Sequence, residues 1–274
     1  MNRRRVASTM LAGSVAPLLM QTRAAAAAAV LDPLTCTVVE DLSSGATLFR
    51  EGESGIRFSP CSTFKVAIAV MGFDAGVLID PHHPVLEYRP EYAAEFDFAK
   101  KTTDPTIWLR DSIVWYSQQT TKTLGMDRFR DYVQRFDYGN QDVSGNPGKN
   151  DGLSQAWLMT SLAISASEQV SFIRRLLDRR LGVSDKAYDM TIASMPVFQT
   201  PGGWTVRGKT GSGWLKDSDG RRRKDRPQGW FVGWGEKAGR TLIFARVEVN
   251  DGPNEKPGGA RARDAFFSRL DTVD

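Results

Sequence analysis

The segment Phe58–Phe73 constrains the fold of this chain more than any other part of the sequence. After Ser59 and Pro60, which suit the N-cap and the first position of a helix, its residues are apolar nearly all round. Such a helix has no face suited to water, so it is stable only inside a protein. We therefore expect a buried helix that has Ser62 in its first turn and ends near Gly76.

Ser62 and Lys65 predict a reactive site at the start of this helix. Residues three apart share one helix face, so the Lys65 amine can reach the Ser62 hydroxyl. Burial favours the neutral amine, which serves as a base or a nucleophile. The backbone N–H of Ser62 has no partner inside the helix and is available to a developing oxyanion. An ordinary helical turn with a solvated lysine is the alternative for this pair alone, whereas the buried setting favours acyl transfer.

Strand signals occupy both ends of the chain, and helical signals occupy its middle. We predict an α+β fold, an α/β sandwich, whose antiparallel sheet comes from residues about 30–60 and 195–274 and is flanked by terminal helices. A helical insertion covers about 61–194, and both parts belong to a single catalytic domain, 30–274, with the site in the cleft between them. The expected strands are 35–39, 46–50, 204–209, 228–234 and 241–250, and the expected helices include 126–136, 167–180 and 260–270.

Residues 1–29 are predicted to be a secretory signal peptide. A basic start, Arg3–Arg5, precedes the apolar stretch Val6–Met20 and the small-residue run Ala24–Ala29. The apolar stretch is too short for a membrane span, so we expect a periplasmic mature protein without membrane attachment, with the twin-arginine route as one hypothesis for export. Four of the 36 Lys and Arg lie in this leader, and the other 32 balance 32 Asp and Glu, which argues against a nucleic-acid partner.

Few other residues suggest a chemistry of their own. His82 and His83 are the only histidines and adjoin prolines, so the sequence offers neither a metal site nor a Ser-His-Asp triad, and we exclude a zinc hydrolase. Cys36 and Cys61 could form a bridge in an oxidising compartment or remain buried thiols. The basic run Arg221–Lys224 is predicted to lie in a solvated hairpin loop.

Five short motifs follow one another along the chain: Ser62-Thr63-Phe64-Lys65, Ser112-Ile113-Val114, Tyr138-Gly139-Asn140, Trp157-Leu158 and Lys209-Thr210-Gly211. Together they resemble the motifs of the class D serine β-lactamases, the oxacillinases. Class A β-lactamases and penicillin-binding proteins share the first and last motifs but usually carry S-D-N or a related polar triplet where this chain has Val114. The resemblance extends over essentially the whole mature chain.

This resemblance implies a serine β-lactamase/transpeptidase-like fold and hydrolysis of the β-lactam ring of penicillin-type antibiotics, which gives resistance. Ser62 would form an acyl-enzyme, with the oxyanion bound by the backbone N–H groups of Ser62 and Ser212. Lys65 would react with carbon dioxide to give N6-carboxylysine, the general base of both steps, so that carbon dioxide or bicarbonate takes the place of a cofactor. Trp157 would hold the carboxylated side chain, and Ser112 would relay a proton to the leaving nitrogen.

The same resemblance implies the contacts with the substrate. Arg263 is assigned to the substrate carboxylate, with Arg261 as the competing candidate, because a guanidinium matches a carboxylate in a way that an ammonium does not. Val114 is expected to keep the surroundings of the lysine dry. Tyr138-Gly139-Asn140 could be an ordinary turn, but its place among the motifs favours a wall of the cleft. The other expected substrate contacts are Leu158, Lys209, Thr210, Gly211 and Ser212.

Two other functions share these motifs. One is a β-lactam-sensing receptor domain, which stays acylated and signals across a membrane. The other is a D-alanyl peptidase or transpeptidase of the penicillin-binding protein class, against which Val114 and Trp157 argue. Turnover of a penicillin separates the three, because the receptor and the peptidase would be trapped after one acylation. The sequence predicts no particular oligomeric state.

Overall fold

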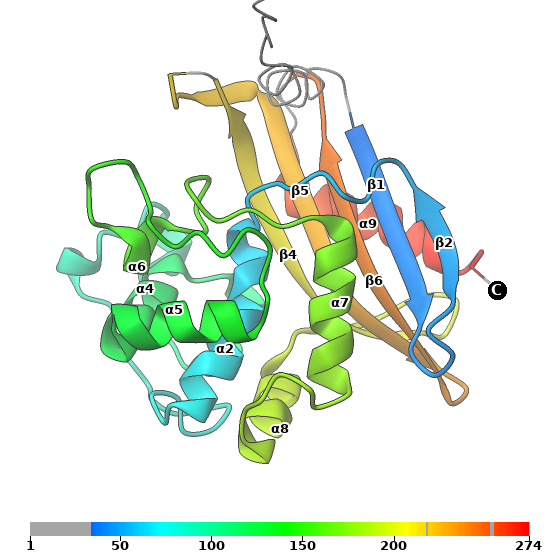
Figure 1. The fold of residues 1–274 in the computed structure, drawn as a ribbon, viewed down its shortest axis with the longest axis horizontal. Coiled ribbons are helices and arrows are strands. Elements are labelled where there is room, and N and C mark those ends of the chain that lie inside the picture. Colours follow the sequence, from blue (N-terminus) through cyan, green and yellow to red (C-terminus); the bar gives the residue numbers. More distant parts are fainter. Residues whose placement is uncertain (1–33, 218, 253–254, 274) are drawn as a thin grey trace, which may run out of the picture. The chain divides into compact units, whose positions relative to one another are not determined.

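One antiparallel sheet forms the framework of the chain. The computed structural model describes residues 34–273 except 218 and 253–254, and the predicted signal peptide, 1–29, lies outside them. In this part of the chain six strands pair in the order β2-β1-β6-β5-β4-β3 (Figure 1). The strands are β1 (Leu34–Asp41), β2 (Thr47–Glu51), β3 (Val197–Gln199), β4 (Thr205–Lys216), β5 (Arg222–Lys237) and β6 (Arg240–Val249).

Strands from both ends of the described chain meet in the middle of this sheet. β1 pairs antiparallel with β6, from Leu34 opposite Val249 to Asp41 opposite Leu242. β5 lies between β6 and β4, so the K-T-G strand is joined to β1 through two intervening strands. The predicted α+β fold with an antiparallel sheet is confirmed, because segments far apart in the sequence complete one sheet.

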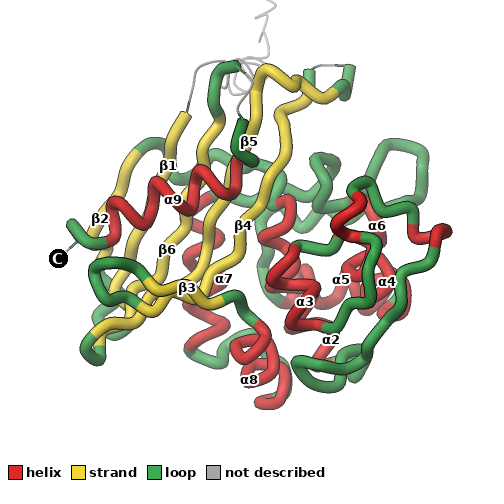
Figure 2. Tube along the Cα trace, turned by 180° about the vertical axis from the view of Figure 1, so that it is seen from behind, coloured by secondary structure: helices red, strands yellow, loops and turns green. Residues whose placement is uncertain are grey.

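Helices cover both faces of the sheet (Figures 1 and 2). α9 (Gly258–Leu270), the predicted closing helix, packs on one face against β4, β5 and β6. α7 (Ala166–Leu177) packs on the other face against β1, β5 and β6. One of these two covering helices therefore comes from the stretch predicted as the helical insertion. Under α9 the rings of Phe244 and Phe266 stack with their centroids 3.9 Å apart, in the apolar core between helix and sheet.

The central helix, α2 (Lys65–Asp74), is the helix predicted to be buried, and it packs against α3, α4 and α8, while α5 and α6 pack against α4. All residues of α2 from Lys65 to Phe73 are buried, as its composition predicts. A single 3-10 turn, η1 (Cys61–Phe64), leads into it. The remaining described helices are η2 (Pro90–Tyr92), η3 (Asp97–Ala99), α3 (Pro105–Asp111), α4 (Val114–Leu124), α5 (Met126–Arg135), α6 (Gly152–Gln155) and α8 (Asp185–Ser194).

The start of the central helix differs from the prediction. Ser59 is not its N-cap, because the flanking residue of η1 is Pro60, which makes no side-chain cap. The Ser59 hydroxyl instead donates to the Trp157 carbonyl and accepts the Met159 N–H. Cys61, with a φ of 49°, turns the chain into η1. The Ser59 hydroxyl therefore bonds to the main chain of Trp157 and Met159, about 100 residues away in the sequence, instead of capping the helix that follows it.

The basic run Arg221–Lys224 lies mostly in a strand rather than in a loop. β4 continues to Lys216, which pairs with Arg222 at the start of β5, so residues 217–221 connect the two strands. The Arg222 guanidinium lies 5.8 Å from the centroid of the Trp214 ring. The prediction of a loop is therefore wrong for Arg222–Lys224, because the pairing of β4 with β5 extends as far as Lys216 and Arg222.

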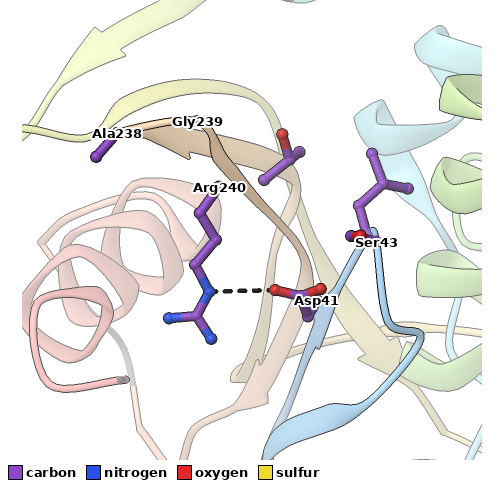
Figure 3. Close-up of a pocket in the computed structure, with 7 residues that line it drawn as sticks. Asp41, Ser43, Ala238, Gly239 and Arg240 are labelled. Atoms are coloured by element: carbon purple, nitrogen blue, oxygen red, sulfur yellow. Dashed lines mark hydrogen bonds and ion pairs between the residues drawn. The ribbon is translucent and has the colours of Figure 1, made fainter.

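At the opposite end of the sheet, the turn after β1 meets the turn between β5 and β6 (Figure 3). Arg240 donates from Nε to an Asp41 carboxylate oxygen at 3.1 Å, and Figure 3 shows the two side chains facing one another. Arg174 of α7 donates to the main-chain carbonyls of Asp41 and Leu42. Charged hydrogen bonds thus hold α7 and two strand turns together.

Candidate active site

Ser62 and Lys65 meet where η1 passes into α2. Lys65 Nζ lies 2.9 Å from Ser62 Oγ, which is a hydrogen-bond distance. Ser62 is partly exposed, whereas its neighbours Cys61, Thr63 and Phe64 are buried. The turn therefore presents one hydroxyl to a ligand and keeps the amine behind it.

Lys65 is completely buried, and none of the described carboxylates forms an ion pair with it. Burial, and to a lesser extent the positive charge of Lys209, holds the pKa of the Lys65 amine well below its usual value. The neutral amine is therefore favoured beside the Ser62 hydroxyl. A group of this kind can accept the proton of an attacking serine.

A second amine and hydroxyl, those of Lys209 and Ser112, come from two other elements. Ser112 ends α3 in the left-handed conformation, with a φ of 60°. Lys209, on β4, lies with Nζ 3.1 Å from Ser112 Oγ and donates to the carbonyl of Thr210 at 3.0 Å. Burial lowers the pKa of Lys209 to about 7, while the negative charge of Asp111 opposes the shift. Lys209 can therefore hold or release a proton beside Ser112 near neutral pH.

Gly211 brings strand β4 against the nucleophile turn. A Cβ atom at this position would lie 2.9 Å from the Pro60 carbonyl oxygen and 3.3 Å from the Ser62 nitrogen. Only glycine permits such a close approach of two backbones. β3 pairs with β4 no further than Arg207, so beyond that residue this edge of β4 has no strand partner in the described part of the chain. The edge is available to η1 and to a ligand.

Trp157 is buried next to the nucleophile turn. The centroid of its ring lies 5.7 Å from that of Phe64 and 6.3 Å from that of Phe129. Its Nε1 is buried, and none of the described residues accepts a hydrogen bond from it. Leaving a buried donor unpaired costs about 1–3 kcal/mol, so this position favours an additional acceptor.

Arg263 shares a pocket with the K-T-G strand. Its side chain, Lys209 and Thr210 all line a cavity of about 410 Å³. The Arg263 guanidinium lies 5.4 Å from the centroid of the Phe198 ring and donates to Asp264 at 2.8 and 3.0 Å. These contacts hold the Arg263 guanidinium beside β4. Arg263 and Asp264 are both partly exposed.

Arg261 has a different environment. Its Nε donates to the buried carboxylate of Glu248 at 2.9 Å, and Arg246 approaches the same carboxylate at 3.7 Å. Arg261 is not among the residues that line the pocket of Arg263. The structure thus places Arg263, and not Arg261, beside Lys209 and Thr210.

The other predicted substrate contacts lie on separate elements. Val114 begins α4, and Leu158 follows the short helix α6. Both side chains are partly buried. Ser212 Oγ accepts the N–H of Gly259 at 2.9 Å, so its side chain is engaged by α9. The main chain of Ser212 directly follows the Gly211 contact with η1.

Tyr138 lies in the core behind the nucleophile turn. It is fully buried, its ring centroid lies 5.0 Å from that of Phe64, and its hydroxyl donates to Gln169 Oε1 at 3.4 Å. Gln169 Nε2 donates to Thr63 Oγ1 at 2.9 Å, and Thr63 donates to the Pro60 carbonyl at 2.7 Å. Sequence reasoning missed Gln169, for which the one available signal is a polar residue on the apolar face of a predicted helix.

The two cysteines of the chain do not form a disulfide bridge. Cys36 and Cys61 are both buried with free thiols, and burial raises the pKa of each to about 11. The described His, Cys, Asp and Glu side chains form no group of three or more that could hold a metal ion. No described helix is long and apolar enough to cross a membrane.

Fold and site together define a class of serine acyl-transfer protein. A partly exposed serine at the start of a buried helix, a lysine one turn further on and a K-T-G strand that packs against the serine turn lie together. The family model for the penicillin binding protein transpeptidase domain matches residues 35–270, nearly the whole described chain.

Comparison with individual proteins narrows this class. The chain is 49% identical over 241 residues to β-lactamase OXA-9 of Klebsiella pneumoniae, covering 88% of each protein. It is 29% identical over 241 residues to OXA-1 of Escherichia coli, covering 87% of this chain and 84% of OXA-1. The crystal structure of the class D β-lactamase OXA-427 matches with a TM-score of 0.78 and 41% identity, over 86% of this chain and 97% of that one. The chain belongs to the class D β-lactamases.

Proposed function

We propose that this β-lactamase opens the lactam ring of penicillin-type antibiotics through an acyl-enzyme on Ser62 and thereby confers resistance. One observation carries the proposal: Lys65 Nζ lies 2.9 Å from Ser62 Oγ and is fully buried, so a neutral amine adjoins the nucleophile. The family supports it, because relatives that cover most of this chain are β-lactamases.

Acylation can be followed atom by atom. Ser62 Oγ attacks the lactam carbonyl carbon while its proton leaves toward the Lys65 side chain. The oxyanion is met by the main-chain N–H groups of Ser62 and Ser212. The lactam C–N bond then breaks, and the Ser112 hydroxyl gives its proton to the leaving nitrogen. Lys209, 3.1 Å from that hydroxyl, restores the proton.

The substrate carboxylate is assigned to Arg263 and Thr210. Both line the cavity beside β4, where the guanidinium supplies a planar donor pair and the threonine a hydroxyl. Lys209 lies on the same strand and, while it is protonated, adds attraction for an anion. These three residues would orient the lactam carbonyl toward Ser62.

Deacylation requires a base for water, and N6-carboxylation of Lys65 fits the residues that surround it. The reaction with carbon dioxide needs a neutral amine, and the burial of Lys65 supplies one. Trp157 Nε1 is a buried donor without an acceptor among the described residues and would hold one carbamate oxygen. Phe64 and Val114 would keep water from the amine. When present, the carbamate supplies a general base for both steps.

We also infer that the mature protein acts in the periplasm. The basic start Arg3–Arg5, the apolar stretch Val6–Met20 and the run Ala24–Ala29 support export and cleavage. A periplasmic location would place hydrolysis where antibiotics meet the enzymes of the cell wall.

The decisive experiment measures penicillin hydrolysis and labelling together. We expect many turnovers per protein molecule, and a slowly hydrolysed β-lactam should add one ligand mass to the peptide that carries Ser62. Ser62→Ala should abolish both, whereas Ser112→Ala should still acquire label at Ser62, more slowly. Release of a single equivalent of product would instead identify a receptor or a peptidase.

The base is tested on the same protein. Acidic buffer depleted of carbon dioxide should remove activity, and added bicarbonate should restore it, because carbamate formation is reversible. A positioned general base contributes roughly 10²–10⁴-fold, so deacylation should fall by at least that lower factor. Full activity in the absence of carbon dioxide would show that Lys65 acts as a plain amine.

A further inference from the structure

Ser59 joins three segments that meet at the nucleophile turn. Its Oγ donates to the Trp157 carbonyl at 2.8 Å and accepts the Met159 N–H at 2.9 Å. Its own carbonyl accepts hydrogen bonds from Gln228 Nε2 at 2.6 Å and Trp230 Nε1 at 2.9 Å, both on β5. The main chain of Ser59 is therefore fixed to β5, and its side chain holds the segment 157–159, here called the Trp157 loop.

The loop that Ser59 holds is tightly bent. Met159 has a φ of 59°, a left-handed conformation that persists only when its surroundings maintain it. The Met159 sulfur accepts the Trp214 N–H at 3.2 Å. Two other hydrogen bonds stay within residues 155–160: the Leu158 N–H and the Thr160 hydroxyl both donate to the Gln155 carbonyl. The Ser59 hydroxyl thus provides a direct link from this loop to the segment that enters η1.

We propose that Ser59 is a positioning residue for the carboxylation of Lys65. Its hydroxyl sets where the Trp157 main chain lies relative to the turn that carries Ser62, and the indole N–H is placed by that main chain. The inference rests on the proposed role of Trp157 in holding the carboxylated lysine.

Loss of the hydroxyl would act on the position of the loop more than on the fold. The Met159 N–H would lose its acceptor and the Trp157 carbonyl its donor, so the loop would be free to shift. The Trp157 ring would still pack on Phe64 and Phe129, and the Ser59 carbonyl would keep its bonds to β5. The expected defect is therefore a weaker hold on the carbamate.

The test compares Ser59→Thr with Ser59→Val, which match in shape and differ in the hydroxyl. Each whole protein is depleted of carbon dioxide at acidic pH, and penicillin hydrolysis is followed as bicarbonate is returned, with isotope-labelled bicarbonate and NMR reporting the carbamate itself. We expect Ser59→Thr to recover near the wild-type bicarbonate concentration. Ser59→Val should need about tenfold more, which corresponds to about 1.4 kcal/mol, and its kcat should recover at saturation.

Ser165→Ala separates positioning from stability. Ser165 forms a capping box with Glu168 at the start of α7, so its loss should lower the Tm without changing the bicarbonate requirement. Ser59→Ala repeats the comparison with a smaller side chain if the valine variant does not fold. The proposal is overturned if wild type requires bicarbonate and the variants without the hydroxyl require no more. A wild type that hydrolyses penicillin with no carbamate signal and no bicarbonate response overturns the carboxylated base, and the role of Ser59 with it.

Discussion

At the scale of single residues, the site is distinguished by two buried lysines that lack close carboxylate partners. Lys65 and Lys209 each bond to a serine hydroxyl, and neither forms an ion pair with a described acid. A buried ammonium without a partner is costly, so burial favours the neutral amine in both. The Lys65 amine can therefore take a proton from Ser62, and Lys209, whose pKa is about 7, can supply one through Ser112 near neutral pH.

Lys209→Met should change how stability depends on pH. The pKa of Lys209 is about 7 in the folded protein, against 10.5 for an ordinary lysine, so between these values the unfolded chain binds a proton that the folded protein does not. This residue therefore makes the free energy of unfolding rise with pH in that window, by up to about 1.4 kcal/mol per pH unit. Urea unfolding at several pH values should show this slope in wild type relative to the variant. A difference that is constant with pH would contradict the lowered pKa.

Arg263→Ala and Arg261→Ala should fail in different ways. Removing a charged hydrogen bond to the substrate carboxylate costs about 1.5–3 kcal/mol, so Arg263→Ala should lower kcat/KM for a penicillin by about 10- to 150-fold. Arg261→Ala leaves the buried Glu248 without its nearest partner and should lower the Tm, since breaking a buried pair costs up to about 3–5 kcal/mol. Its folded fraction should keep near wild-type kinetics. Steady-state rates and thermal melts of both variants check this, and the reverse ranking would reassign the carboxylate to Arg261.

At the scale of elements, the site depends on the contact between η1 and β4. Ser62 belongs to the turn and Ser212 to the strand, so the distance between their N–H groups is set by how closely two backbones approach. The close packing of Gly211 against the Pro60 carbonyl fixes that approach. Gln169 holds the same turn from α7 through Thr63.

Gly211→Ala should therefore impair acylation. A Cβ atom 2.9 Å from the Pro60 oxygen forces the strand and turn apart, which weakens the oxyanion site. Loss of one oxyanion donor costs about 10²–10³-fold in kcat, and we expect a loss near the lower value. Gly55→Ala is the matched control, because a Cβ there meets nothing within 4 Å. Pre-steady-state acylation rates measure the effect, and equal rates in the two variants would exclude this role of Gly211.

The elements were predictable to the extent that local pattern determines them. The hairpin of β1 and β2, the buried α2 and the closing α9 follow from apolar periodicity, and the contact of Ser62 with Lys65 follows from spacing on one helix face. Contacts between distant segments were not predictable without the family resemblance. The local pattern around Ser59 predicts an N-cap, so it gives no sign of the hydrogen bond from Ser59 to the Trp157 carbonyl. Likewise, nothing in the sequence near Arg261 indicates its pairing with Glu248.

At the scale of the whole molecule, we predict that the exported protein is shorter than the sequence. The alanine run suits a signal peptidase, so cleavage is expected within about Ala24–Val30. Mass spectrometry of the periplasmic fraction would give the new N-terminus. An active cytosolic protein that still begins at Met1 would show that the leader is retained.

The order of strands in the sheet also has a consequence for folding during synthesis. Leu34 pairs with Val249, so β1 finds its neighbour β6 only after nearly all of the chain has been made. Until then β1 has β2 alone, and an isolated two-stranded hairpin is at best marginally stable in water. Pairings that distant in sequence also slow folding. The sheet would thus close only when synthesis is nearly complete, and β1 would have no partner but β2 until then.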